Sequence, residues 1–226
     1  MIAPKARRLF YAALAATLIL KLLFAAFLPM TGDEAYFVVW GMHPALGYYD
    51  HPPMVGWWLS ALLPFGHAEW WLRMPAIALN TFIGWAIMRI LRPHRGDLAY
   101  LTGALYLIAP VNLYNVLITT DTPVILFIFL TGWAYYRALV SGAWRDYLLA
   151  GLAVGMGMLS KYFEGLIAVA LAAHWLLLDI TARRPGHLQL SITPMRSAVV
   201  PAVIMARLLP VNRLITSEPR WSVIRA

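Results

Sequence analysis

The amino-acid sequence predicts an all-α fold, a polytopic transmembrane helical bundle, and three observations carry this prediction. Hydrophobic residues make up 62% of the 226 positions. Charged residues make up only 12%, about half the share found in ordinary soluble domains. Apolar runs of about 18 residues recur, and each is long enough to cross a hydrocarbon core as a helix. Such a chain requires lipid as its solvent.

Six apolar segments are predicted to form the membrane helices. They are residues 9–30, 74–91, 98–109, 122–140, 147–160 and 162–180. The first follows the basic start MIAPKARR and is longer than the apolar region of a secretory signal, so it is predicted to be a retained helix. The third and fifth segments are short for a crossing and are expected to extend into neighbouring residues. Residues 1–184 therefore form the predicted membrane core.

Two further segments differ from this core in composition. Residues 31–73 begin with polar positions and then become rich in tryptophan, whose indole ring favours the headgroup level of a bilayer. This segment is therefore predicted to form interfacial helices in the first external loop. Residues 185–226 carry regularly spaced prolines, which interrupt helices, and are predicted to be a separate proline-rich tail.

The distribution of charge predicts an orientation for the bundle. If the N-terminus is cytoplasmic, most Lys and Arg residues fall on cytoplasmic segments, as membrane proteins require. The external segments then hold only Arg73 and Lys161 among the cations, together with six of the ten acidic residues. The formal net charge of +8 thus reflects topology, and the basic residues form no patch suited to nucleic acid.

The first external loop begins with the adjacent carboxylates Asp33 and Glu34, directly after the first predicted helix. Two readings of this pair stay open. Acidic groups at the mouth of a membrane bundle suit a functional site, whereas acidic groups in a first turn also stabilise a helix through its dipole. Further along the loop, Asp50 and His51 precede two prolines that fix a turn. That turn either presents both side chains toward a substrate cleft or leaves them in solvent.

Asp121 begins a later predicted helix on the same face as Asp33. Two such carboxylates are able to hold a divalent cation or to orient a hydroxyl group, although an acidic helix start is also ordinary capping. Lys161 is external against the general trend, which indicates either a phosphate contact or a side chain that reaches the interface. Lys21 lies in the middle of the first predicted helix, where a charge must face the bundle or an aqueous cavity.

Four sequence blocks in order resemble a known family. They are GDEAYF at 32–37, LGYYDHPPMVGWW at 46–58, TTDTPVILF at 119–127 and LSKYF at 159–163. Together they resemble the bacterial GT-C membrane glycosyltransferases of the protein mannosyltransferase and aminoarabinose transferase type (glycosyltransferase family 39). The resemblance covers roughly residues 9–180. Members of this family are generally longer, so the chain is expected to be a truncated member that inserts into the membrane but transfers sugar poorly.

The resemblance implies transfer of a sugar from a polyprenyl-phosphate carrier to an acceptor hydroxyl on a lipid, glycan or protein. The reaction is expected at the external, periplasmic face of the bacterial inner membrane. By resemblance, Asp33 and its motif neighbour Glu34 are the expected catalytic residues, with Asp33 acting as a base or positioning the acceptor. The expected substrate-binding residues are Asp50, His51, Asp121, Lys161 and Tyr162. A divalent cation at Asp33 and Asp121 is the one cofactor considered.

Two other functions stay open from the sequence. A transporter or flippase for a lipid-linked sugar would use the same acidic external cleft without chemistry. Such a protein is expected to show internal pseudo-symmetry and polar residues near the membrane midplane, and the sequence shows neither apart from Lys21. An inactive membrane fragment is the other alternative. Release of polyprenyl phosphate separates an enzyme from both.

Overall fold

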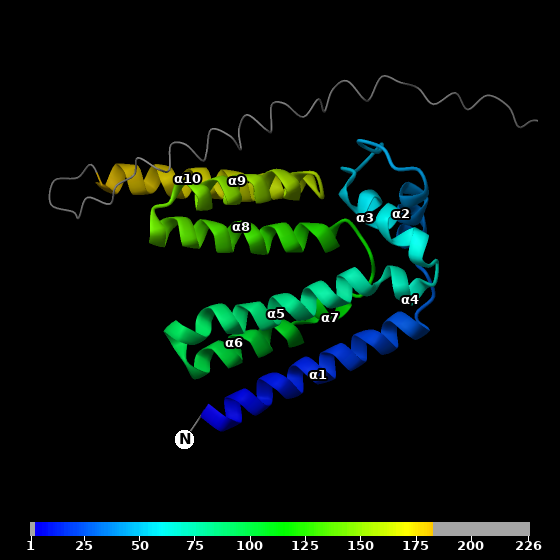
Figure 1. Ribbon diagram of the computed structural model, residues 1–226, viewed down its shortest axis with the longest axis horizontal. Coiled ribbons are helices and arrows are strands. Elements are labelled where there is room, and N and C mark those ends of the chain that lie inside the picture. The colour runs from blue at the N-terminus through cyan, green and yellow to red at the C-terminus, as the bar shows by residue number, and fades with distance from the viewer. Residues whose placement is uncertain (1–2, 183–226) are drawn as a thin grey trace, which may run out of the picture.

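The computed structural model describes residues 3–182, and the predicted proline-rich tail at 185–226 lies outside these residues. Within the described part every regular element is a helix, which confirms the predicted all-α fold. The longer helices lie alongside one another, and a group of short helices caps one end of the bundle (Figure 1).

The six predicted membrane segments each correspond to one α-helix, and in the sixth segment three residues of 3-10 helix precede the α-helix. These are α1 (Ala3–Phe27), α5 (Met74–Arg95), α6 (Asp97–Ile108), α8 (Asp121–Ser141), α9 (Trp144–Met158) and α10 (Gly165–Ala182). Two helix ends depend on glycine. Gly96 follows α5 with φ 50° and Gly142 follows α8 with φ 65°, conformations that glycine adopts without the steric cost of a Cβ.

The shorter elements connect these helices. They are α2 (Gly32–Met42), α3 (Met54–Leu62), η1 (Leu63–Phe65), α4 (Glu69–Leu72), α7 (Pro110–Tyr114) and η2 (Tyr162–Glu164). The helices expected in the tryptophan-rich loop are thus present as α2 to α4, which we call the external helices after their predicted side of the membrane. Whether they lie at a bilayer interface stays a prediction.

Three helical stretches of the described chain are long and apolar enough to cross a membrane, judged by length and composition. They are Pro4–Phe27, Glu69–Arg95 and Asp121–Ser141. Segments 98–109 and 147–160 were expected to be short and to extend into neighbouring residues, and α6 and α9 begin one and three residues before these segments and remain short. With 12 and 15 residues, α6 and α9 span only about 18 and 22 Å at the rise of an α-helix, less than the roughly 30 Å of a hydrocarbon core. Gly96 and Pro110 confine α6, because neither residue continues a helix well.

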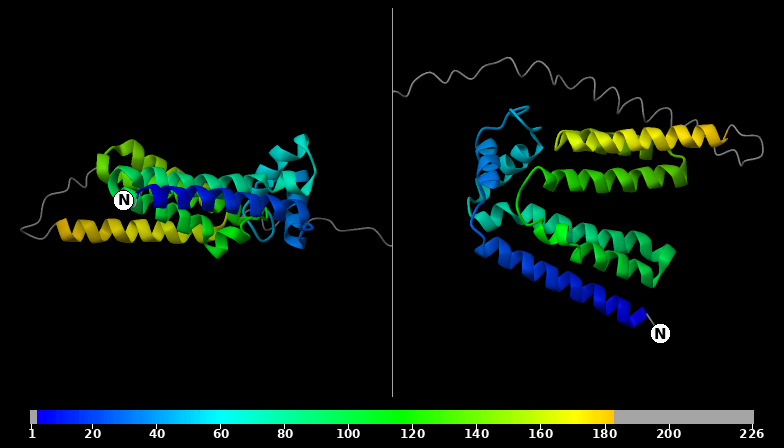
Figure 2. Two further views of the ribbon diagram at one scale, coloured as in Figure 1. Left: turned by 90° about the horizontal axis from the view of Figure 1, so that it is seen from below. Right: turned by 180° about the vertical axis from the view of Figure 1, so that it is seen from behind.

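The helices pack in two groups, with α1, α5 and α6 in one and α8, α9 and α10 in the other (Figures 1 and 2). In the first group Phe10 is fully buried against Met88 and Leu107. Glycine allows α5 and α6 to approach closely, since a Cβ at Gly103 would lie 2.9 Å from the backbone oxygen of Gly84. A separate hydrophobic cluster, with Phe37, Trp40, Leu59 and Ile118, joins the external helices to the segment before α8.

Lys21 lies on the buried side of α1, as its charge requires. It is 1% exposed, and its Nζ has no hydrogen-bond partner among the described residues. Along α1 it lies one turn before Ala25, which packs with Ile77 of α5. One turn further along α5 is the buried Asn80, whose amide oxygen accepts from the Tyr106 hydroxyl at 3.3 Å. The interior between α1 and α5 therefore contains polar side chains at the level of Lys21 and Asn80.

Candidate functional site

A buried ion pair fixes the external helices to the bundle. Arg73 precedes α5, and its Nε and Nη2 donate to the two carboxylate oxygens of Glu34 on α2 at 2.8 and 2.7 Å. Both side chains are at most 1% exposed. The remaining N–H groups of the guanidinium donate to the carbonyl oxygens of Ala25, Leu28 and Pro29, where α1 ends. Because a helix end leaves carbonyls without partners, Arg73 joins α1, α2 and α5 at one point.

Glu34 has further contacts that occupy its carboxylate. It forms a capping box with Thr31, whose hydroxyl accepts from the Glu34 N–H while the Thr31 N–H donates to Glu34 Oε2. The Ile118 N–H donates to Oε1 at 3.2 Å. Burial raises the pKa of Glu34, but hydrogen bonds from Arg73, Thr31 and Ile118 and the Arg73 charge hold it below its ordinary value. The ionised carboxylate is thus a buried connector between α2, α5 and the segment before α8.

Asp33 has a different environment from its neighbour. It lies in the first turn of α2 and is exposed. The helical period places Asp33 on the same face of α2 as Tyr36, Phe37 and Trp40, three, four and seven residues later. Asp33 is exposed whereas Glu34 is buried, so Asp33 points to the surface and Glu34 points into the protein. Only Asp33 is accessible to a substrate.

Asp50 and His51 lie against this face of α2. The Tyr36 hydroxyl donates to Asp50 Oδ1 at 3.4 Å, and His51 Nδ1 lies 3.1 Å from Asp50 Oδ2. The His51 ring lies near the rings of Phe37 and Trp40, with centroid distances of 6.1 and 6.0 Å. The Asp50 and His51 side chains are 42% and 33% exposed. The turn thus holds both residues in place and leaves them open to a ligand.

Asp121 and Lys161 meet although they lie 40 residues apart. Lys161 Nζ donates to Asp121 Oδ1 at 2.6 Å, joining the start of α8 to the segment after α9. The two side chains are 31% (Lys161) and 49% (Asp121) exposed. Tyr162, the next residue, is also exposed. This accessible ion pair offers a cation and a carboxylate at one point.

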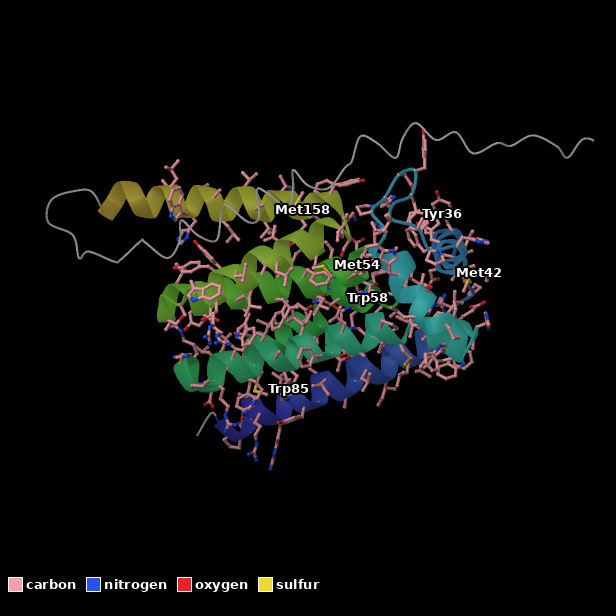
Figure 3. All side chains as sticks on the ribbon, turned by 45° about the horizontal axis from the view of Figure 1, so that its top comes forward. Tyr36, Met42, Met54, Trp58, Trp85 and Met158 are labelled. Carbon is pink, nitrogen blue, oxygen red and sulfur yellow. The ribbon has the colours of Figure 1, made fainter. Side chains whose placement is uncertain are left out.

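Two hydrogen bonds from backbone N–H groups connect α2 and the turn after His51 to the segments that carry Asp121 and Lys161. The Ile118 N–H reaches Glu34 and lies three residues before Asp121. The Met54 N–H donates to the Leu159 oxygen at 3.1 Å, which joins the turn after His51 to the segment before Lys161. Figure 3 shows Met54 between Tyr36 on α2 and Met158 at the end of α9. The predicted site residues therefore gather at the end of the bundle that carries the external helices (Figure 1).

The structure does not bring every predicted partner together. No contact joins Asp33 to Asp121 among the described residues, and within them no three His, Asp or Glu side chains gather as metal ligands. A divalent cation at Asp33 and Asp121 therefore stays a prediction that the described geometry does not support.

Three residues of this region were not identified as site residues from the sequence. Arg73 is one of only two cations on the predicted acidic face, and this rarity is itself a signal. Tyr36 follows Asp33 by three residues, which is the spacing of one helix face. Glu164 is 1% exposed, and neither of its carboxylate oxygens has a partner in the described part of the chain. It packs on Gly157, where a Cβ would lie 2.6 Å from Glu164 Cδ.

Comparisons with known proteins agree with the resemblance. Residues 50–209 match the model of the dolichyl-phosphate-mannose-protein mannosyltransferase family. The lipid A galacturonosyltransferase RgtD of Rhizobium johnstonii (strain DSM 114642 / LMG 32736 / 3841) is 31% identical over 134 residues. These residues are 58% of this chain and 28% of the relative, so the match spans less than a third of that protein. No solved structure matches.

The family match includes Asp50, His51, Asp121 and Lys161, whereas Asp33 and Glu34 precede its first residue. Most of the accessible site therefore lies in the matched part. The matched segment covers more than half of the chain, and the chain accordingly belongs to the dolichyl-phosphate-mannose-protein mannosyltransferase family.

Proposed function

We propose that this protein transfers a sugar from a polyprenyl-phosphate carrier to an acceptor hydroxyl at the external face of the bacterial inner membrane. The observation that carries the proposal is the accessible Asp121–Lys161 pair, at the same end of the bundle as Asp33 and Asp50. The family and the related galacturonosyltransferase, both named for sugar transfer, support this reaction class. A lipid donor also fits a protein whose long helices are apolar.

Lys161 is the proposed contact for the donor phosphate. When the bond between the anomeric carbon and the phosphate oxygen breaks, the electron pair stays on the phosphate, and an ammonium group stabilises that charge. Asp121 holds Lys161 in place before the donor arrives, and Tyr162 extends the same surface. In this arrangement the donor phosphate either displaces the Asp121 carboxylate from Lys161 or binds to Lys161 beside it.

Asp33 is the proposed catalytic carboxylate that meets the acceptor at the anomeric carbon. An exposed carboxylate in this place takes the proton of the attacking hydroxyl or orients the acceptor for attack. Glu34 has a positioning role, since its buried contacts to Arg73 and Ile118 fix α2 and hence Asp33.

The related lipid A galacturonosyltransferase suggests the first substrates to test. We propose undecaprenyl-phosphate galacturonic acid as donor and lipid A as acceptor, with glycan and protein acceptors tested beside it. Release of undecaprenyl phosphate that depends on the acceptor supports transfer. Movement of the intact donor across vesicle membranes without release would support a flippase instead. If neither release nor movement occurs, the protein is an inactive membrane fragment.

Lys161→Met is expected to weaken donor binding by about tenfold or more, because a charge-assisted contact to phosphate is lost. Acceptor binding should change little. Both affinities are to be measured on the intact protein in membrane vesicles, with Lys5→Met at the start of α1 as the matched control. Unchanged donor affinity in Lys161→Met would remove Lys161 from the donor site.

The proposed orientation is tested by labelling, and the absence of native cysteine makes single-cysteine variants clean reporters. Tyr49→Cys, at a fully exposed position beside Asp50, should react with a membrane-impermeant maleimide added outside intact cells. Arg92→Cys should react only after the membrane is opened. Labelling of Arg92→Cys in intact cells would reverse the scheme.

A further inference from the structure

Tyr36 has an exposed ring that the proposed reaction does not explain. The residue is 43% exposed, yet its hydroxyl is directed to Asp50 Oδ1. Burial and the neighbouring Asp50 charge raise the pKa of Tyr36, so the phenol keeps its proton and donates. Because Tyr36 follows Asp33 by three residues, the ring lies on the same face of α2 as the proposed catalytic carboxylate.

A rigid aromatic layer holds this ring in place. The Tyr36 ring packs edge-on against Trp40 at 4.8 Å between centroids. On Trp40 the Tyr48 ring is stacked at 4.1 Å with an interplanar angle of 3°. The Tyr48 hydroxyl donates to the Trp40 oxygen at 2.9 Å, so the loop that carries Asp50 is fixed to α2. The accessible part of Tyr36 is therefore preorganised.

The chemistry of this surface suits a sugar ring. A carboxylate accepts about four hydrogen bonds. Tyr36 uses one position on Asp50, and His51 Nδ1 lies 3.1 Å from the other oxygen without a hydrogen bond, which leaves acceptors for two neighbouring hydroxyl groups of a pyranose. An aromatic face offers an apolar platform for the C–H face of the same ring. A phosphate group or the carboxylate of a uronic acid would meet the like charge of Asp50, so Asp50 suits the hydroxyl groups of the ring and not its anionic groups.

We propose that Tyr36 and Asp50 form the subsite that holds the sugar ring of the donor, between Asp33 on α2 and the phosphate contact at Lys161. This inference rests on the proposed function. The hydrogen bond from the Met54 N–H to the Leu159 oxygen supports the placement, because it brings the turn after Asp50 to the segment before Lys161. The sugar then lies with its anomeric carbon toward Asp33 and its phosphate toward Lys161.

The test compares two ligands, undecaprenyl phosphate and the same lipid carrying galacturonic acid, on the intact protein in membrane vesicles. Tyr36→Ala and Asp50→Asn should each weaken binding of the sugar-bearing lipid about tenfold and leave the affinity for the bare carrier within about twofold. Lys161→Met should weaken both lipids. Tyr49→Ala is the matched control, since the Tyr49 ring is fully exposed beside Asp50.

The outcomes separate the two proposals. Equal weakening of both lipids by Tyr36→Ala and Asp50→Asn would place these residues at the phosphate and overturn the sugar subsite, as would unchanged binding of both. If the unaltered protein binds neither lipid, the proposed function fails and the subsite with it. Tyr36→Phe keeps the packing on Trp40, so a selective loss of sugar-bearing lipid in this variant supports the subsite even if Tyr36→Ala folds poorly.

Discussion

Replacing Asp33 by asparagine should lower turnover about 100-fold or more while donor affinity stays close to that of the unaltered protein. Asparagine keeps the size of the side chain but removes the charge and the basic oxygen. If Asp33 takes the proton or orients the acceptor, the substitution lowers the rate of the transfer step, which follows donor binding. Transfer rate and donor binding are to be measured on the same purified variant, in the intact protein.

A purely structural role of Asp33 predicts a different result. In the first turn of α2 the charge of Asp33 interacts favourably with the helix dipole, which stabilises the protein by about 1 kcal/mol or less. The capping hydrogen bonds come from Thr31 and Glu34. Asp33→Asn should therefore shift thermal stability only slightly. Asp97→Asn is the matched control, because Asp97 also lies in the first turn of a helix, α6. Near-normal turnover in Asp33→Asn would end its catalytic assignment.

The sequence was sufficient for features that follow from hydrophobic runs and from motif order. The long apolar runs predicted α1, α5 and α8 because only lipid-compatible helices satisfy their backbone groups. Asp121 and Lys161 were expected on the same side of the membrane, and the structure places Lys161 Nζ 2.6 Å from Asp121 Oδ1. Such agreement is possible because membrane topology limits which loops can meet.

The sequence could not separate the roles of adjacent residues. Asp33 and Glu34 look equivalent in the motif, but the 100° step of a helix turns one outward and the other into the protein. Whether the inward carboxylate is catalytic or structural depends on its partner, and Arg73 lies 39 residues away. The exact ends of α6 and α9 were also harder to predict, since apolar composition indicates membrane residence but not where a helix ends.

Arg73→Met should destabilise the protein by about 3–5 kcal/mol, the largest stability effect we expect. The substitution leaves the Glu34 carboxylate buried without its bidentate partner, and it removes the donors to Ala25, Leu28 and Pro29. Chemical unfolding in detergent measures the effect. Arg95→Met at the exposed end of α5 is the control, and it should change stability little.

A double variant tests whether the loss comes from the unpaired charge. Glu34→Gln combined with Arg73→Met removes both charges, so it should be more stable than Arg73→Met alone, because no ionised group remains buried without a partner. If the double variant is instead as unstable as the sum of the two single variants, the pair is not energetically coupled. The role of Arg73 would then lie in its bonds to the end of α1, since those contacts are lost equally in both variants that lack Arg73.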